Sequence, residues 1–262
     1  MQDFNRVLEL AIETGQIMLQ SGAETHKAEE VMHNVCRGFG HAESEGYVTL
    51  TGIFLSLKDS SGNVSTSIKR IEDRSTDLEK ISRITKLTQT LLKRNDSQSH
   101  SARHMTFDEY NANLIEITRK KQYPMWAKVL CGGLSCGCFT MLFGGSWRQF
   151  YVAVPAGILL RMFLLFLIRL RLNNFLLNAL GAAFLVWVAK MAVTNIGLMN
   201  SDKIIIGGIM LLVPGLAITN AIRDTMAGDL VAGNARMMEA FFVSVAIATG
   251  AGTMLKLWSL IS

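Results

Sequence analysis

The sequence predicts a membrane protein in which an N-terminal cytoplasmic α+β domain, residues 1–122, is followed by an all-α bundle of five transmembrane helices, residues 123–262. The distribution of charge is the first reason. Residues 1–122 carry 16 Lys and Arg against 17 Asp and Glu, whereas residues 123–262 carry 10 against 4 among long apolar runs. Cationic flanks beside apolar runs are typical of membrane spans, and a nucleic-acid-binding protein would instead concentrate its basic residues on one face. We therefore expect a lipid bilayer as a partner, and no nucleic acid.

The second reason is the length of the apolar stretches, since about 20 residues cross the roughly 30 Å hydrocarbon core of a bilayer. Five such stretches follow one another at about residues 125–143, 150–168, 175–193, 204–222 and 237–257. The bias of Lys and Arg between the connecting loops predicts a cytoplasmic N-terminus and an outside C-terminus. Small residues, among them Gly133, Gly137, Gly207 and Gly208, allow these helices to approach closely.

Helical patterns begin and end the N-terminal domain. Apolar residues at helical spacing over residues 4–19 predict the first helix, and a second helix opens at Glu24 and Thr25. Charges interrupt the first 20 residues, so we expect no secretory signal peptide. Two later helices are each predicted by a capping box, Thr76-x-x-Glu79 and Thr106-x-x-Glu109.

Strand patterns lie between these helices. Residues 47–57 are rich in β-branched and aromatic side chains and predict one strand, and residues 64–68 predict a second, shorter one. Turn-forming residues at 58–63 join them, which predicts a β-hairpin. The polar stretch 95–104 is expected to be a loop.

Residue types that carry catalysis or bind metals are sparse. The four cysteines do not form a disulfide framework, and three of them lie in the apolar run 131–138, where we interpret them as small buried residues. The five histidines show no metal-ligand spacing, and residues 1–122 hold no nucleophile elbow or P-loop. We therefore expect no catalytic residues, no metal and no cofactor.

The stretch 211–240 is the leading candidate for a functional site. It holds three of the four acidic residues beyond residue 122, and charge near lipid is expensive enough to need a functional reason. Pro214 removes a backbone hydrogen bond inside an expected span, as in the broken helices that form transporter sites, although a simple packing kink explains it equally well. The candidate residues for substrate binding or transport are Pro214, Gly215, Asn220, Asp224, Asp229, Arg236, Glu239 and Arg161.

Spacing suggests how these residues act. Asn220 and Asp224 are four apart and share one helix face, while the glycines at 228 and 233 are expected to make the connection to the last span flexible. An acidic residue whose pKa is raised by burial could carry a coupled proton. Alternatively, Asp224, Asp229 and Arg236 cap helices and pair with one another at the membrane surface. Arg161, in the middle of a span, is expected either to form an ion pair with one of the acids or to meet a substrate carboxylate.

These residues give the chain a recognisable pattern. It resembles the N-terminal half of the threonine/serine exporter family in three segments: Gly15-x-x-Met18-Leu-x-Ser-Gly-Ala-Glu24, Tyr123-Pro-x-Trp126 with Gly133-Leu-Ser-Cys-x-Cys138, and Leu212-Val-Pro-Gly215 with the polar residues that follow up to Ala240. The resemblance covers nearly the whole chain. Fused members of the family have about twice as many spans, so it implies one component of a split system, most like the larger subunit of the two-component succinate exporter.

The resemblance also implies what the protein does. It implies a subunit of a secondary exporter of small carboxylate metabolites, succinate or threonine and serine, driven by the proton motive force. The partner would be a second, smaller multi-pass subunit in the bacterial inner membrane, and association into a homo-oligomer stays open. The alternative is a membrane-anchored sensory, regulatory or hydrolytic protein that uses the cytoplasmic domain. The Gly22-Ala23-Glu24 turn is interpreted as a helix cap rather than as a functional junction.

Overall fold

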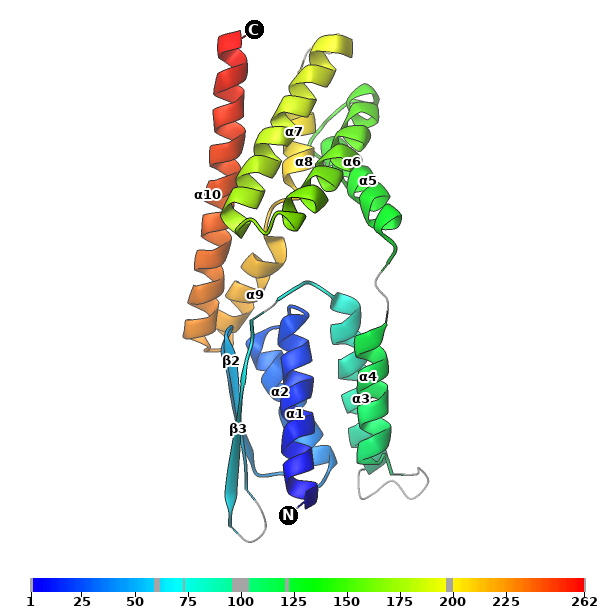
Figure 1. The fold of residues 1–262 in the computed structure, drawn as a ribbon, viewed down its shortest axis with the longest axis vertical. Helices are drawn as coiled ribbons and strands as arrows, with labels where there is room; N and C mark the ends of the chain where they lie inside the picture. The colour runs from blue at the N-terminus through cyan, green and yellow to red at the C-terminus, as the bar shows by residue number, and fades with distance from the viewer. Residues whose placement is uncertain are drawn as a thin grey trace. The chain divides into compact units, whose positions relative to one another are not determined.

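The computed structural model describes residues 2–58, 62–72, 74–95, 104–120, 123–196 and 200–261. Half of the expected turn at 58–63 and most of the expected loop at 95–104 lie outside these residues. The chain divides into two compact units (Figure 1). The first unit consists of Met1–Lys121 together with Thr219–Met237, and the second of Gln122–Ile218 together with Met238–Ser262. The first unit thus includes residues 219–237 as well, and the expected domain boundary near residue 122 stays a prediction.

The first unit stacks a helix pair between a sheet and a second helix pair (Figure 1). Its helices are α1 (Gln2–Gln20), α2 (Thr25–Gly38), α3 (Leu78–Asn95) and α4 (Phe107–Arg119). The α1–α2 pair contacts the sheet on one side and α3 and α4 on the other. The expected apolar stripes are buried here, with Val7, Ala11, Met32 and Val35 fully inside the core. The α+β composition of this part of the chain is therefore confirmed.

The sheet has three antiparallel strands in the order β1 (Ser44–Val48), β2 (Gly52–Lys58) and β3 (Val64–Arg70). The prediction of one strand over residues 47–57 is wrong, because the chain reverses between Val48 and Gly52. Thr49 causes the reversal: its backbone N–H donates to the Gly52 carbonyl over 2.8 Å, and its hydroxyl accepts from the Gly52 N–H over 3.1 Å. Side-chain bonds of this kind compete with strand pairing and favour a turn.

One of the two predicted N-cap residues is confirmed, and the other is wrong by one position. The Thr106 hydroxyl accepts the Glu109 N–H at the start of α4, as predicted. At the start of α3, however, the cap is Asp77, whose carboxylate accepts the Lys80 N–H over 3.1 Å. Aspartate is as good an N-cap as threonine and adds a negative charge at the positive end of the helix, which explains the shift of one residue.

The second unit consists of helices, and within the described residues four helices of the chain are long and apolar enough to cross a membrane. They are α5 (Met125–Leu142), α6 (Trp147–Arg169), α7 (Asn174–Ile196) and α10 (Leu230–Ile261). The stretch 204–222 is divided instead into two short helices, α8 (Asp202–Ile209) and α9 (Gly215–Met226). The count of five spans therefore stays a prediction, as does the cytoplasmic location of the first unit.

Glycines allow the membrane helices to pack closely, as predicted. A Cβ at Gly133 would lie 2.7 Å from the Val154 carbonyl oxygen, and one at Gly157 would lie 2.6 Å from the Cβ of Cys136, so α5 and α6 cross with their backbones close together. A Cβ at Gly208 would lie 2.5 Å from the Leu185 side chain, and one at Gly207 would overlap Thr140. Each of these glycines is at a helix contact where a side chain would not fit.

Candidate functional site

Residues 219–237 lie in the first unit and contact the turn between α1 and α2. We call this contact the polar junction: the side chains of Asn220, Asp224 and Arg236 on one side and the turn Gly22–Thr25 on the other. The two sides are about 200 residues apart in the sequence. All three residues are at most 7% exposed. The polar junction is therefore a buried set of contacts and not a surface ion pair.

Asp224 lies at the centre of the polar junction. Its Oδ1 atom accepts two hydrogen bonds from Thr25, one from the backbone N–H over 3.1 Å and one from the hydroxyl over 2.9 Å. Thr25 is the first residue of α2, and the preceding Glu24 makes no side-chain cap of its own. Asp224 therefore caps α2 from another helix, and its negative charge lies at the positive end of that helix. These interactions offset the cost of burying a carboxylate that is 0% exposed.

Arg236 supplies the counter-charge. Its Nε atom lies 2.9 Å from Asp224 Oδ2, and one of its terminal NH2 groups donates to the Ala23 carbonyl over 2.7 Å. The amide of Asn220 donates to the Gly22 carbonyl over 3.0 Å, and Arg223 forms a more exposed ion pair with Glu24. The prediction that Asn220 and Asp224 share one face of a helix is confirmed, and that face contacts the α1–α2 turn.

The turn between α9 and α10 orients these side chains. Gly228 has a φ of +93°, and the Asp229 N–H donates to the Asp224 carbonyl over 2.9 Å, which is the glycine-terminated Schellman arrangement of a helix end. The Asp229 carboxylate then caps α10 by accepting the Ala232 N–H over 3.1 Å. The expectation that Gly233 belongs to a flexible connection is wrong. Gly233 lies inside α10, where a side chain would collide with Thr225 of α9.

Glu29 is a further acidic group beside the polar junction. It lies half-buried on α2, and its Oε1 atom accepts the Val48 N–H over 2.9 Å. Burial raises the pKa of the Glu29 carboxyl above its ordinary value near 4.5, and the negative charges of Asp229 and Asp224 raise it further, against the lowering effect of the Val48 hydrogen bond and of His26. Folding therefore favours the protonated form of Glu29.

A Glu29→Gln variant is expected to be more stable than the wild type at neutral pH. A raised folded-state pKa means that the contribution of protonated Glu29 is fully present below pH 4.5 and is lost as the pH rises through the raised value. Glutamine keeps an acceptor for the Val48 N–H without the charge, so the melting temperature should lose this part of its pH dependence. The matched control is Glu30→Gln, an exposed residue paired with Lys27. Equal pH profiles for wild type and Glu29→Gln would contradict the assignment.

The remaining predicted site residues lie in the second unit. Pro214 and Gly215 mark the interruption between α8 and α9, where Met210–Val213 form turns. Glu239 is half-buried on α10. Arg161 lies on α6 with its aliphatic carbons next to Gly132 of α5, and among the described residues it has no ion-pair partner. Of the acids proposed for it, Asp224 is paired with Arg236 instead.

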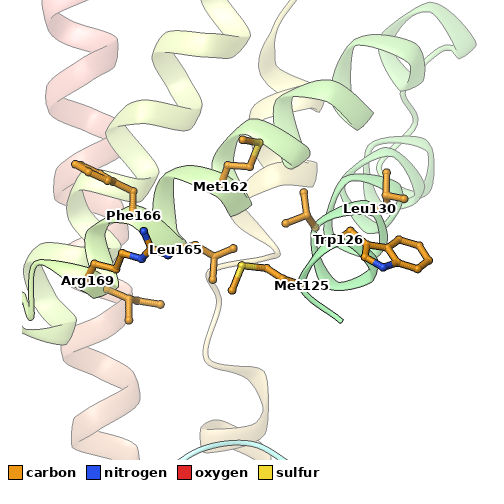
Figure 2. Close-up of a pocket in the computed structure, with 9 residues that line it drawn as sticks. Met125, Trp126, Leu130, Met162, Leu165, Phe166 and Arg169 are labelled. Atoms are coloured by element: carbon orange, nitrogen blue, oxygen red, sulfur yellow. The ribbon is translucent and has the colours of Figure 1, made fainter. Parts of the chain in front are cut away.

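An apolar groove opens between α5 and α6 (Figure 2). It has a volume of about 710 Å³ and is lined by Met125, Trp126, Val129, Leu130, Met162, Leu165, Phe166, Ile168 and Arg169. Arg169 is the one cation in this lining. The groove therefore lacks the several convergent polar groups by which a site recognises a small charged ligand. In the part of the chain that the structure describes, no group of three or more His, Cys, Asp or Glu residues is placed to hold a metal ion.

The α1–α2 turn is the part of the site that the sequence did not predict. Gly22 has a φ of +89° and ends α1, so its interpretation as a helix cap is correct, but the carbonyls of Gly22 and Ala23 also accept bonds from Asn220 and Arg236. A signal was available, because Glu24 and Thr25 open α2 without a Ser, Thr, Asp or Asn at the cap position. A helix start that lacks its own cap indicates that another part of the chain supplies one.

Comparison with known proteins places the chain in a family. The profile of the family described as "Putative threonine/serine exporter" matches residues 9–258. A "Probable threonine/serine exporter" of Mycobacterium tuberculosis is 25% identical over 94% of this chain, which spans 45% of that relative's length. The "Probable succinate transporter subunit YjjP" of Escherichia coli is 26% identical over 97% of this chain and 95% of its own length. No solved structure matches. Because the profile covers nearly the whole chain, the chain belongs to the threonine/serine exporter family.

Proposed function

We propose that this chain is the larger subunit of a two-component secondary exporter of small carboxylate metabolites, either succinate or threonine and serine, driven by the proton motive force. The family is one of exporters, and the four long apolar helices fit an integral membrane protein. A relative that aligns over 95% of its length is named as a transporter subunit, and one that is about twice as long is named as an exporter by itself. These two lengths support a second, smaller membrane subunit as the partner. Association with further copies of this chain stays open.

The observation that carries this proposal is that one helix links the interrupted span to the polar junction. Helix α9 begins directly after Pro214 and carries both Asn220 and Asp224. Twelve residues of continuous helix form a stiff rod, so a reorientation of α9 at the interruption must strain or open the polar junction. Interrupted helices with charged ends are how many transporters build a site that alternates between two sides of a membrane. We therefore assign the polar junction as the cytoplasmic gate.

The charged residues are assigned roles within this gate. Arg236 and Arg161 are the candidates for contacting a substrate carboxylate, since a guanidinium presents a planar pair of donors that matches it. Asp224, Asp229 and Glu239 are the candidates for carrying a coupled proton. Pro214, which has no backbone N–H to continue the helix, shapes the site together with the neighbouring Gly215. In this proposal the protein lies in the bacterial inner membrane, with the N-terminus in the cytoplasm and the C-terminus outside.

Efflux from cells tests the proposal. Cells that express this chain together with a small partner subunit should export succinate, or threonine and serine, and cells that express this chain alone should not. Pro214→Ala should reduce export by at least about tenfold while leaving the amount of folded protein unchanged, because alanine restores the missing N–H and favours a continuous helix. Pro155→Ala, in the uninterrupted helix α6, is the matched control. Full export by the chain alone would contradict the two-component assignment, and normal export by Pro214→Ala would remove the interruption from the mechanism.

A further inference from the structure

The apolar groove between α5 and α6 lies where these two helices diverge (Figure 1). The helices cross closely at Gly133 and Gly157, where a Cβ on either glycine would overlap atoms of the facing helix. All residues that line the groove lie within the first turns of α5, residues 125–130, and the last turns of α6, residues 162–169. Figure 2 shows the two walls, with Trp126 on the α5 side and Phe166 on the α6 side. The side chains of the two helices therefore leave a volume of about 710 Å³ unfilled beside one end of the pair.

This end of the helix pair has the composition of a membrane surface. Helix α5 begins at Met125 and α6 ends at Arg169, so the groove lies where the chain enters the first helix and leaves the second. Tyr123 and Trp126 are 71% and 68% exposed there. Tyr and Trp are enriched at the depth of the lipid headgroups, because their rings are apolar with a polar tip. In a bilayer, the apolar walls of the groove thus face acyl chains, and Arg169 faces the headgroups.

The charges at this end call for an anion from outside the membrane helices. Residues 123–201 contain six Lys and Arg and no Asp or Glu. Within the described residues Arg169 forms no ion pair, and the exposed Arg171 adds a second positive charge two residues further on. A lipid phosphate is the anion that a membrane surface offers, and a guanidinium binds phosphate through two parallel hydrogen bonds.

The shape of the lining favours a lipid chain over a helix of another protein. Membrane helices associate through small residues that let their backbones approach, as α5 and α6 do at Gly133 and Gly157. None of the residues that line the groove is small. Met125 and Met162, one from each helix, have long flexible side chains that adapt to the shape of a ligand. A flexible acyl chain fits such walls better than a rigid helix does.

We propose that this groove binds an anionic phospholipid, with an acyl chain between α5 and α6 and the headgroup phosphate on Arg169. Basic pockets between membrane helices bind anionic headgroups in this way. A lipid bound there holds the diverging ends of α5 and α6 together, and by mass action it stabilises the folded protein. The proposal depends on the chain being an integral membrane protein and is independent of the proposed export function.

Native mass spectrometry of the purified full-length chain in detergent tests the binding, with phosphatidylglycerol and phosphatidylcholine of the same acyl chains as probes. The wild type should bind phosphatidylglycerol about fivefold more tightly than phosphatidylcholine, and Arg169→Gln should remove this difference. The matched control is Arg148→Gln, an exposed cation at the other end of α6, which should keep the preference. Val129→Trp fills the groove without changing its charge and should weaken the binding of both lipids. An unchanged preference in Arg169→Gln, or unchanged affinities in Val129→Trp, would overturn the proposal.

Photocrosslinking in cells identifies the occupant. A photoreactive phenylalanine analogue is placed at Phe166, which lines the groove and is 57% exposed, or at Phe242 of α10, which does not line it and is 55% exposed. Adducts at position 166 should be enriched in anionic phospholipid relative to those at position 242. Equal lipid composition at the two positions, or an adduct at position 166 with the mass of a second polypeptide, would overturn the proposal. Neither test measures transport, so a chain that exports nothing can still show the lipid preference.

Discussion

Arg236→Ala should destabilise the protein by about 3–5 kcal/mol and abolish export, because it leaves the Asp224 carboxylate buried without its counter-charge. Asp224 is 0% and Arg236 8% exposed at the side chain, so solvent cannot replace the lost partner. The Ala23 carbonyl loses its donor in the same substitution. The measurements are thermal unfolding of the purified protein and metabolite efflux from cells, corrected for the amount of protein in the membrane.

The matched control for this prediction is Arg223→Ala. Arg223 also forms an ion pair with the α1–α2 turn, but its side chain is 66% exposed, and exposed pairs contribute about 0–1 kcal/mol. Arg236→Lys separates stability from transport, since it keeps a positive charge next to Asp224 while losing the planar fork. Export by Arg236→Lys at the wild-type rate would show that Arg236 stabilises the junction without contacting substrate. A melting temperature of Arg236→Ala equal to that of the wild type would contradict the buried ion pair itself.

Gly250→Leu should have the second large effect, a loss of about 3 kcal/mol or more through separation of α7 from α10. A Cβ at position 250 would collide with the carbonyl oxygen of Ala179, and it would lie 2.7 Å from the carbonyl carbon. Backbone atoms of a packed helix cannot move aside as the end of a side chain can. The expected result is a lower melting temperature in detergent and less folded protein in the membrane.

Gly252→Leu is the control for this second prediction. It lies two residues further along the same helix, and nothing is within 4 Å of a Cβ placed there. Leucine is a better helix former than glycine by roughly 1 kcal/mol, so this variant should be as stable as the wild type or more so. If the two leucine variants unfold at the same temperature, the close crossing of α7 and α10 is wrong.

The elements of the fold that depend on local pattern could be predicted from the sequence. Helices α1 and α5 appear within a few residues of the expected bounds because their apolar residues recur at helical spacing over their whole length. The strand over residues 47–57 could not be placed correctly, because its composition favours a strand throughout and one Thr49 hydroxyl decides the reversal. Helix α10 begins seven residues before the expected start of the last span, because the Asp229 cap holds residues 230–236 in helix.

The candidate site could be predicted in part. Asp224 and Arg236 attract notice because charge is rare in that half of the chain, and Asn220 because its spacing puts it on one helix face with Asp224. The structure brings all three together. Their partners on the other side of the polar junction are the carbonyls of Gly22 and Ala23 and the N–H and hydroxyl of Thr25. Most of these are backbone groups, which leave no mark in a sequence. Glu29 does not stand out in the sequence, because its surroundings include two distant segments, at Val48 and at Asp224 and Asp229. Arg161 stands out because it lies in the middle of an apolar stretch, which the sequence shows. Its contacts depend on how the helices pack, which the sequence does not show.

The contact between residues 22–25 and residues 220–236 also sets an order in time. A ribosome adds about 5–20 residues per second, so roughly 10–40 s separate the synthesis of the two sides. During that interval α2 has no cap for its Thr25 N–H, and the surface that α9 and α10 will cover is exposed. The three long apolar helices α5, α6 and α7 are made before the missing piece arrives. Completion of the first unit thus reports that the chain has been translated past residue 236. A chain stalled before residue 220 presents an unfinished surface to the cell's proteases.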